Sequence, residues 1–177
     1  MILEIQNLCK RYGSGKNVLN DLNVSVPGGT IIGLLGPNGC GKTTLIKMIC
    51  GLLPITSGSI HIDGRAPGPE SAPLISYLPE RTYFDPGMRV KDLLRYFADF
   101  YADFRMDTAQ QMLADLRIDP RARMKTLSKG TREKVQLVLV MSRRAILYLL
   151  DEPIAGVDPA SRDYILNTRE HICLQQR

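Results

Sequence analysis

Alternation of apolar and polar residues marks the first part of the chain as sheet-forming. Leu22, Val24 and Val26 alternate with polar residues, and the Pro-Gly-Gly sequence at 27–29 supplies a turn. The mostly apolar run Thr30–Leu35 is typical of a strand that is buried on both faces of a sheet. We therefore expect short strands and then a buried strand that leads directly into a glycine-rich loop.

Further apolar runs predict more strands and one helix among them. Thr43–Leu53 has helical character and ends before a proline. Ile60 and Ile62 indicate a strand that is closed by an Asp-Gly turn, and Ile75–Leu78 is a short apolar strand. Ala145–Leu150 predicts another strand, late in the chain.

In the middle of the chain the apolar residues recur at the spacing of a helix, every three or four positions. One set of apolar residues lies at helical spacing: Val90, Leu93, Leu94, Phe97, Phe100, Tyr101 and Phe104. A second helix presents the apolar face Ala109, Met112, Leu113 and Leu116. A third helix is expected from near Thr131 to about Arg144, and we expect the aromatic stripe of the first helix to be core. Strands on both sides of a helical insert predict an α/β domain that carries a helical subdomain at about 86–144.

The composition is that of one globular domain. The chain has 177 residues, of which 44% are apolar and 23% charged, and single domains have roughly 100–200 residues. No apolar run approaches the ~18 residues of a membrane span, and the acid Glu4 stands where a signal peptide carries positive charge. These features predict a cytoplasmic protein. The scattered cysteines, with no CxxC pair, agree with a reducing compartment: Cys9, Cys40, Cys50 and Cys173.

The net charge of +5 is concentrated in one segment. Residues 121–144 hold eight basic residues and one acid, Glu133. Such a segment is either a solvated helix face or a surface for phosphate, nucleic acid or a membrane. Both interpretations stay open on the sequence alone.

A glycine-rich loop follows the predicted strand Thr30–Leu35. Its sequence, Gly36-Pro37-Asn38-Gly39-Cys40-Gly41-Lys42-Thr43, fits G-x-x-x-x-G-K-[ST] and leads into a predicted helix. Glycines let backbone N–H groups surround phosphate oxygens, and the helix N-terminus adds favourable partial charge. Lys42 is then placed for the β and γ phosphates, and the Thr43 hydroxyl for Mg²⁺.

Two acids follow the last predicted strand, Ala145–Leu150. A strand end beside the phosphate loop is where a second Mg²⁺ ligand belongs, which suits Asp151. Glu152 has the chemistry to accept a proton from an attacking water. The alternative is that one of the two acids merely caps the following turn.

The sequence Leu127-Ser128-Lys129-Gly130-Thr131 stands where the third predicted helix begins. Ser128 and the backbone at Gly130 form either a second anion site or an ordinary helix N-cap. Two phosphate sites in one chain, separated by a helical insert, suggest that the second serves a nucleotide held by another subunit.

Together these motifs resemble the nucleotide-binding domain of ATP-binding cassette (ABC) proteins, from Leu3 to about Asn167. The resemblance implies an α/β P-loop NTPase fold of the ABC type: an antiparallel N-terminal β subdomain, a mostly parallel core sheet and a helical signature subdomain. The predicted domain is 1–168, and 169–177 is expected to be a tail outside the family.

The resemblance also implies roles for individual residues. Ile146–Asp151 corresponds to the Walker B motif, Glu152 to the catalytic carboxylate and Leu127–Thr131 to the signature that contacts ATP on the opposite subunit. Tyr12 corresponds to the aromatic residue that stacks on adenine, and Asp158 to the acid of a loop that crosses the dimer interface. The implied Walker A residues are Gly36, Pro37, Asn38, Gly39, Cys40, Gly41, Lys42, Thr43 and Thr44.

The sequence departs from the family pattern at three places. Glu80 stands where the family has a glutamine; a carboxylate there can accept a hydrogen bond from water or approach Mg²⁺, but it adds negative charge near the γ-phosphate. Lys129 and Thr131 replace Gly and Gln in the signature. Few residues follow Glu152, so we expect the final strands and the switch histidine to be missing and His171 to be a surface or helix residue.

The sequence therefore predicts an ATPase that binds ATP and Mg²⁺, with Glu152, Lys42 and Glu80 as its catalytic residues. We expect an ABC transporter subunit, peripheral on the inner face of the membrane, with a second ABC subunit and separate transmembrane permease subunits as partners. Two alternatives are a fragment that binds ATP but scarcely hydrolyses it, and a soluble ABC protein that acts on nucleic acid. No nucleic acid partner is expected. Members of the family that act in translation usually carry two cassettes, and those that act on DNA carry a long coiled coil; the sequence shows neither feature.

Overall fold

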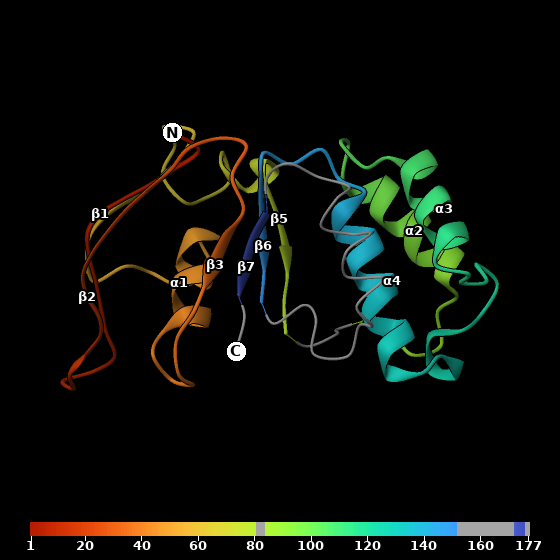
Figure 1. The fold of residues 1–177 in the computed structure, drawn as a ribbon, viewed down its shortest axis with the longest axis horizontal. Coiled ribbons are helices and arrows are strands. Elements are labelled where there is room, and N and C mark those ends of the chain that lie inside the picture. Colours follow the sequence, from red (N-terminus) through yellow and green to blue (C-terminus); the bar gives the residue numbers. More distant parts are fainter. Residues whose placement is uncertain (81–83, 152–171, 176–177) are drawn as a thin grey trace.

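The computed structural model describes residues 1–80, 84–151 and 172–175. Figure 1 shows their layers in order: an antiparallel sheet, helix α1, a parallel sheet, and then helix α4 with α2 and α3 beyond it. The parallel sheet is thus covered by helices on both faces, as is typical of α/β domains. The predicted α/β class with a helical insert is confirmed.

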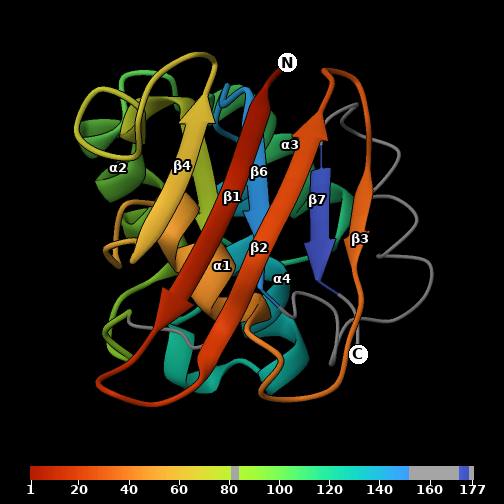
Figure 2. The same cartoon turned by 90° about the vertical axis from the view of Figure 1, so that its left-hand side faces the viewer.

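The antiparallel sheet has three strands, β1 (Leu3–Arg11), β2 (Asn17–Val26) and β4 (Ser57–Ile62), in the order β2-β1-β4. β1 is central and pairs antiparallel with both neighbours. Figure 2 shows this sheet in front of α1. Leu3 and Ile5 of β1 are only 4% and 2% exposed because they face that helix and its surroundings.

The parallel sheet has the order β3-β7-β6-β5. Its strands are β3 (Ile32–Leu34), β5 (Ile75–Leu78), β6 (Leu147–Leu150) and β7 (Ile172–Gln175). β5 has the predicted bounds, and β6 lies within the predicted run and is buried at every residue. β5 pairs in parallel with β6 from one end to the other.

Strand β3 differs from its prediction. Complete burial was expected, but Ile31 and Leu35, which flank the strand, are 50% and 71% exposed. The reason is position: among the described residues, β3 is an edge strand that pairs only with β7.

Strand β7 corrects the expectation that no further strand follows β6. Ile172–Gln175 lies between β3 and β6 and pairs in parallel with both. A run of three apolar residues is too short to identify a strand by its pattern. Its backbone groups are satisfied by two neighbouring strands, which a reading of local sequence does not reveal. The boundary of the family region at residue 168 stays a prediction.

Helix α1 (Lys42–Ile49) packs between the two sheets. Its apolar side chains Leu45, Ile46, Met48 and Ile49 are at most 6% exposed. The helix ends earlier than the predicted Leu53 because Gly51 has a φ of 70°, a conformation that glycine adopts without a steric penalty.

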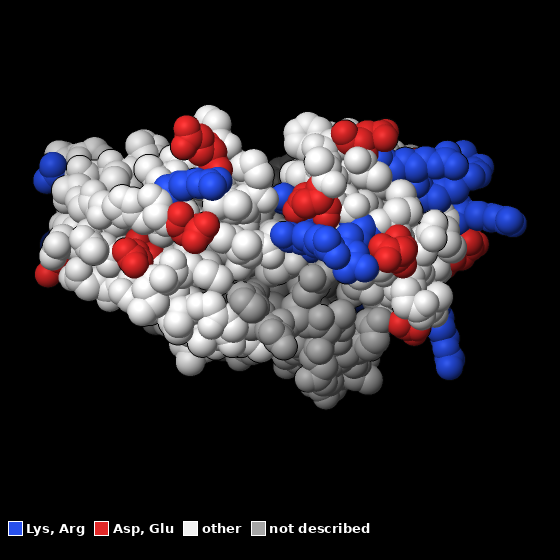
Figure 3. All heavy atoms as spheres, turned by 90° about the horizontal axis from the view of Figure 1, so that it is seen from above, with Lys and Arg blue, Asp and Glu red and all other residues white. Residues whose placement is uncertain are grey.

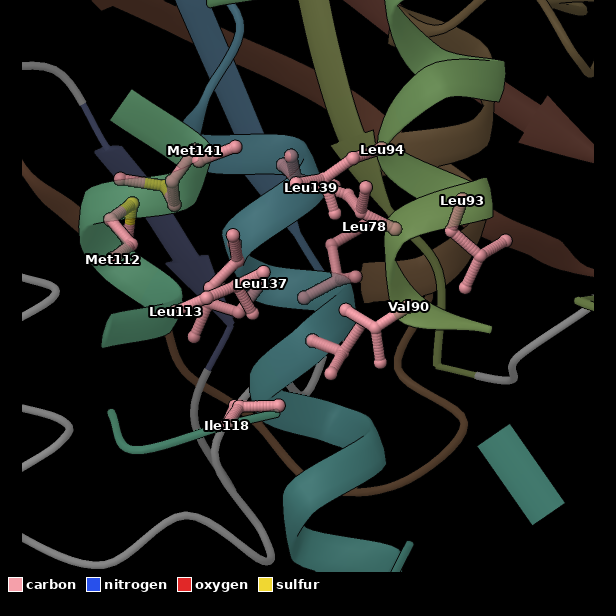
Figure 4. Close-up of a cluster of buried hydrophobic side chains, with 14 of the residues drawn as sticks. Leu78, Val90, Leu93, Leu94, Met112, Leu113, Ile118, Leu137, Leu139 and Met141 are labelled. Carbon is pink, nitrogen blue, oxygen red and sulfur yellow. The ribbon is translucent and has the colours of Figure 1, made fainter. Parts of the chain in front are cut away.

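The helical half contains α2 (Val90–Phe100), α3 (Met106–Asp115) and α4 (Lys129–Met141), with short 3₁₀ helices at Ala72–Leu74 and Met124–Thr126. Its core is drawn in Figure 4, where side chains from α2, α3 and β5 surround α4. The labelled residues are Leu78, Val90, Leu93, Leu94, Met112, Leu113, Ile118, Leu137, Leu139 and Met141.

The aromatic stripe of α2 is only partly core. Phe97 and Phe104 pack against the buried cluster, as predicted. Phe100 is 68% exposed, so its predicted burial is wrong. The reason is the face of the helix: Phe100 stacks on Tyr96, four residues earlier, with ring centroids 6.1 Å apart, and Tyr96 is itself 53% exposed.

Arg143 joins the end of the helical half to the parallel sheet. Its Nε donates to Asp103 Oδ1 at 3.0 Å, and its Nη atoms donate to Ile75 O at 2.6 Å and Pro73 O at 2.9 Å. The guanidinium also lies 4.0 Å from the centroid of the Tyr101 ring. One of the eight cations of the basic segment is therefore buried and ion-paired and does not belong to a solvated face.

Candidate functional site

The loop between β3 and α1 depends on glycine at both ends. Gly41 has a φ of 99°, and a Cβ there would lie 2.9 Å from Leu19 Cδ2 and 3.0 Å from Val18 Cγ1. A Cβ at Gly36 would lie 2.8 Å from Cys40 Sγ. Any side chain at these two positions would therefore displace the loop or strand β2, which packs against it.

The N-terminus of α1 is open to an anion. Among the described residues no side chain caps it, and its first turn contains no acid. The first N–H groups of a helix have no partner within the helix and carry positive partial charge. The phosphate interpretation of this loop agrees with both features.

Lys42 lies inside the curve of the loop. It is 7% exposed, and its Nζ donates to Gly36 O at 2.7 Å and to Pro37 O at 3.1 Å. The ammonium is thus held by the loop itself, directly beside the helix N-terminus. Phosphate oxygens that enter the loop would meet a cation that is already in place.

Thr43 and Asp151 meet although they are 108 residues apart. Thr43 Oγ1 donates to Asp151 Oδ1 at 3.1 Å. Asp151 is 2% exposed, and its N–H donates to Leu78 O at 2.9 Å, which fixes it at the end of β6. A hydroxyl and a carboxylate oxygen form a hard donor pair that fits Mg²⁺.

Tyr12 lies beside the first turn of α1. Its hydroxyl is 3.4 Å from Thr44 Oγ1, and the residue is 50% exposed. Lys10 Nζ lies over the ring at 5.0 Å from its centroid. The structure thus brings together Tyr12, Lys42, Thr43, Thr44 and Asp151 around the start of one helix.

Glu80 is exposed and follows β5. Leu78 of β5 pairs with Leu150 of β6, so Glu80 emerges at the same edge of the sheet as Asp151. Its proposed role near Mg²⁺ or the attacking water stays a prediction. Glu152, Asp158 and His171 lie outside the described residues.

The signature residues Leu127–Thr131 lie at the N-terminus of α4, where Ser128 is the N-cap residue. Ser128 Oγ accepts from Thr131 N–H at 3.1 Å, and Ser128 Oγ and Thr131 Oγ1 lie 2.8 Å apart. Gly130 lies in the first turn, and the exposed Lys129 is 3.9 Å from Glu133. The N-cap interpretation is therefore confirmed, and the second anion site stays a prediction. Figure 1 shows that α4 and α1 begin at the same edge of the parallel sheet, on opposite faces.

A cleft of about 610 Å³ lies between the two halves of the molecule. Its wall is mostly apolar and includes Cys50, Ala72, Phe100 and Tyr101, with Arg143 and Asp103 at its polar end. Figure 3 shows the hollow between the two halves and the gathering of Lys and Arg on the helical half. Burial, and secondarily the negative charge of Asp151, raise the pKa of the Cys50 thiol to about 12.

Sequence reasoning missed two buried cations. No burial was predicted for Lys10, and the solvated-face interpretation of residues 121–144 would expose Arg143, but these two residues are 6% and 4% exposed. A signal for Lys10 was available, because it shares the period-two alternation of β1 with Leu8, which is fully buried. No such local signal exists for Arg143, since Asp103 and Ile75 are distant in sequence.

The described part of the chain contains neither a helix that could span a membrane nor a cluster of metal-binding side chains. None of its helices is both long enough and apolar enough to cross a membrane. Within the same residues, His, Cys, Asp and Glu do not form a cluster of three or more that would hold a metal ion by itself. A metal at Thr43 and Asp151 would therefore need further ligands, such as phosphate oxygens and water.

Comparison with known proteins matches these features to one family. The sequence model described as ABC transporter matches residues 19–155. The lipopolysaccharide export system ATP-binding protein LptB of Escherichia coli is 36% identical, with 96% of this chain aligned to 75% of LptB. The SkfA peptide export ATP-binding protein SkfE of Bacillus subtilis is 31% identical, with 94% of this chain and 72% of SkfE covered.

One further relative is about twice as long as the aligned region, and a solved structure shares the fold. The chain spans about half the length of the uncharacterized ABC transporter ATP-binding protein YhaQ of Bacillus subtilis, covering 55% of it at 35% identity. A solved structure of an ATP-binding subunit of an ABC transporter superposes with a TM-score of 0.88 at 29% identity, over 100% of this chain and 80% of the other. The chain therefore belongs to the ABC transporter family of ATP-binding proteins, and its fold is that of their P-loop ATPase domain.

Proposed function

We propose that this chain binds Mg-ATP at the start of α1 and couples ATP hydrolysis to transport by separate membrane subunits. The observation that carries the proposal is the 3.1 Å contact between Thr43 Oγ1 and Asp151 Oδ1. It joins the phosphate loop to the end of the strand that precedes the proposed catalytic acid. The family membership supports the same conclusion.

The loop would bind the triphosphate through its backbone and through Lys42. Phosphate oxygens accept hydrogen bonds from the free N–H groups at the start of α1, and the Lys42 ammonium exchanges its carbonyl partners for phosphate oxygens. Because the ammonium is already held by Gly36 and Pro37, little side-chain ordering remains to be paid on binding.

Thr43 and Asp151 would hold Mg²⁺ together with phosphate oxygens. When bound, the ion neutralises phosphate charge and withdraws electrons from the phosphoryl group. Asp151 is fixed for this role by its own backbone bond to Leu78. The proposed general base is Glu152, which would take the proton of the attacking water, and Glu80 would orient that water or approach the ion.

The start of α4 would act on ATP held by a second ABC subunit. Ser128 and Gly130 lie at the same sheet edge as the phosphate loop but on the other face of the sheet. One chain therefore offers two half-sites. Two chains arranged with the loop of one opposite the α4 start of the other would complete two sites.

The membrane partner would bind at the cleft between the two halves. The cleft is lined by apolar atoms and bordered by Phe100 and Leu52, which are 68% and 61% exposed. Exposed apolar surface of this kind is typical of an interaction site. LptB and SkfE are named as ATP-binding proteins of export systems, which supports a transport role and a peripheral position at the membrane.

The test is calorimetric titration of ATP and Mg²⁺ into the wild-type chain and two lysine variants of α1. Lys42→Ala should abolish binding. Lys47→Ala is the matched control, because Lys47 is exposed on the same helix and should leave the affinity unchanged. Unchanged binding in Lys42→Ala would remove the phosphate site from this loop.

A further inference from the structure

Lys10 is a buried cation that the proposed function does not use. It is 6% exposed, at the end of β1. Buried lysines are rare, and a buried ammonium is costly unless its donors are satisfied. Its Nζ donates a hydrogen bond to Pro54 O at 2.5 Å. Such a group needs a structural or functional reason.

The end of β1 is tied to the segment that follows α1. Thr56 N–H donates to Cys9 O at 3.1 Å, and Arg11 N–H donates to Thr56 Oγ1 at 3.0 Å. The Lys10–Pro54 bond is a third link between the same two segments. Hydrogen bonds at Cys9 and Arg11, the two neighbours of Lys10, therefore fix its position relative to the segment that follows α1.

The ammonium of Lys10 lies over the ring of Tyr12. Nζ is 5.0 Å from the ring centroid, within the distance of a cation–π contact. The Tyr12 hydroxyl contacts Thr44 Oγ1 at 3.4 Å, so the ring is held at its face and at its tip. The residue is nevertheless 50% exposed, which leaves surface for a ligand.

We propose that Lys10 is the positioning residue of the adenine platform: it holds the Tyr12 ring in place through the cation–π contact. The proposal rests on the proposed function, in which Tyr12 stacks on the base of ATP. A ring fixed before binding loses less conformational freedom when a base stacks on it. Lys10 would therefore contribute to the affinity for the base and not to the affinity for the phosphates, which bind at the start of α1.

The experiment separates the contribution of the base to ATP affinity from the contribution of the phosphates. Binding of ATP and of inorganic tripolyphosphate, both with Mg²⁺, is measured by calorimetry for the wild type and for Lys10→Met, Lys10→Arg and Tyr12→Leu. Methionine keeps an unbranched stem of similar length and removes the charge, and arginine restores a cation that binds aromatic faces. Lys16→Met is the matched control, since Lys16 is an exposed lysine near the same strand end.

We expect Lys10→Met to weaken ATP binding about three- to tenfold, the size of one cation–π contact. Tripolyphosphate binding should stay unchanged, Lys10→Arg should recover most of the loss, and Lys16→Met should show none. The double variant with Tyr12→Leu should be no weaker than Tyr12→Leu alone, because the two residues act as one unit.

Three results would overturn the proposal. Equal weakening of ATP and tripolyphosphate by Lys10→Met would mean that Lys10 only supports α1. Full ATP affinity in Lys10→Met, with a loss in Tyr12→Leu, would refute the role of Lys10 and leave the adenine platform intact. Full affinity in Tyr12→Leu would refute the platform itself, and Lys10 with it.

Discussion

Helices α1 and α4 begin at the same edge of the parallel sheet, but their first turns are completed differently. α1 has glycine before its first residue and, within the described residues, no side-chain cap. α4 has Ser128, whose Oγ accepts from Thr131 N–H. The first helix thus leaves its N–H groups to a ligand, whereas the second satisfies one of them itself.

From this difference we infer which of the two proposed half-sites is sufficient to bind ATP in a single chain. The α1 site already contains a buried cation, a fixed carboxylate and an aromatic side chain in Lys42, Asp151 and Tyr12. The α4 site offers one hydroxyl, one glycine and an exposed Lys129. A single chain should therefore bind ATP at α1, and α4 should contribute only when a second subunit brings a nucleotide to it.

The largest expected effect separates the two sites by affinity. Lys42→Ala should weaken ATP binding by about a hundredfold or more, because charge-assisted contacts to phosphate are lost. Ser128→Ala should change single-chain ATP binding by less than about twofold, an energy below one hydrogen bond. Calorimetry at a concentration where the chain is monomeric measures both. A large loss of single-chain affinity in Ser128→Ala would break the distinction.

The next test concerns the ion pair between Asp103 and Arg143, which lies just past the C-terminal end of α4. Asp103→Asn should lower the free energy of unfolding by about 2–4 kcal/mol, because it leaves a buried guanidinium without its counter-ion. The exposure of Asp103 limits the effect, since 29% of its side chain is accessible. Urea denaturation measures the change, with Asp115→Asn in α3 as an exposed-acid control. Equal stability of Asp103→Asn and wild type would show that the carboxylate does not hold the two halves together.

The α4 cap itself should have a smaller effect on stability. Ser128→Ala should cost about 1 kcal/mol of unfolding free energy, and Ser128→Asn should cost close to nothing because asparagine is as good a cap. Thermal denaturation of the three proteins gives the comparison. If alanine and asparagine were equally destabilising, the Ser128–Thr131 bond would have no part in starting the helix.

Cys50, at the C-terminal end of α1, should make the free energy of unfolding depend on pH in the alkaline range. The folded protein raises the pKa of Cys50 from 9.0 to about 12 because it buries the thiol, so the unfolded chain loses its proton first. The contribution is fully present below pH 9 and is lost as pH rises toward 12, by about 1 kcal/mol at pH 10. Urea denaturation at pH 8 and pH 10 should show this loss in wild type and a smaller loss in Cys50→Ala. An identical pH dependence in both proteins would assign it to other groups.

Residues that act through local sequence were predictable, and residues that act through tertiary contacts were not. The spacing of residues 36–43 identifies the phosphate loop, and Asp151 is predicted beside it because a second Mg²⁺ ligand belongs at a strand end next to that loop, which agrees with the Thr43–Asp151 contact. Strand β7 was missed because it is short and its partners, β3 and β6, are far away in sequence. Arg143 was missed for the same reason.

Exposure was the least predictable property. Thr30–Leu35 was expected to be buried on both faces, and the edge position of β3 leaves Leu35 71% exposed. Phe100 continues an apolar stripe but lies with Tyr96 on a face of α2 that stays exposed. In both cases the local pattern is that of a core element, and the neighbours that decide burial are set by the fold.

The most direct test of the account is the number of subunits in an ATP-bound complex. Sedimentation with Mg-ATP is measured for Glu152→Gln, which should hold ATP without turnover, and for Glu152→Gln combined with Ser128→Ala. We expect a dimer with one ATP per chain in the first protein, and a monomer that still binds one ATP in the second. A Glu152→Gln protein that stays monomeric with ATP bound, or a dimer that is indifferent to Ser128, would contradict the claim that α1 binds ATP alone and α4 acts on the ATP of a second subunit.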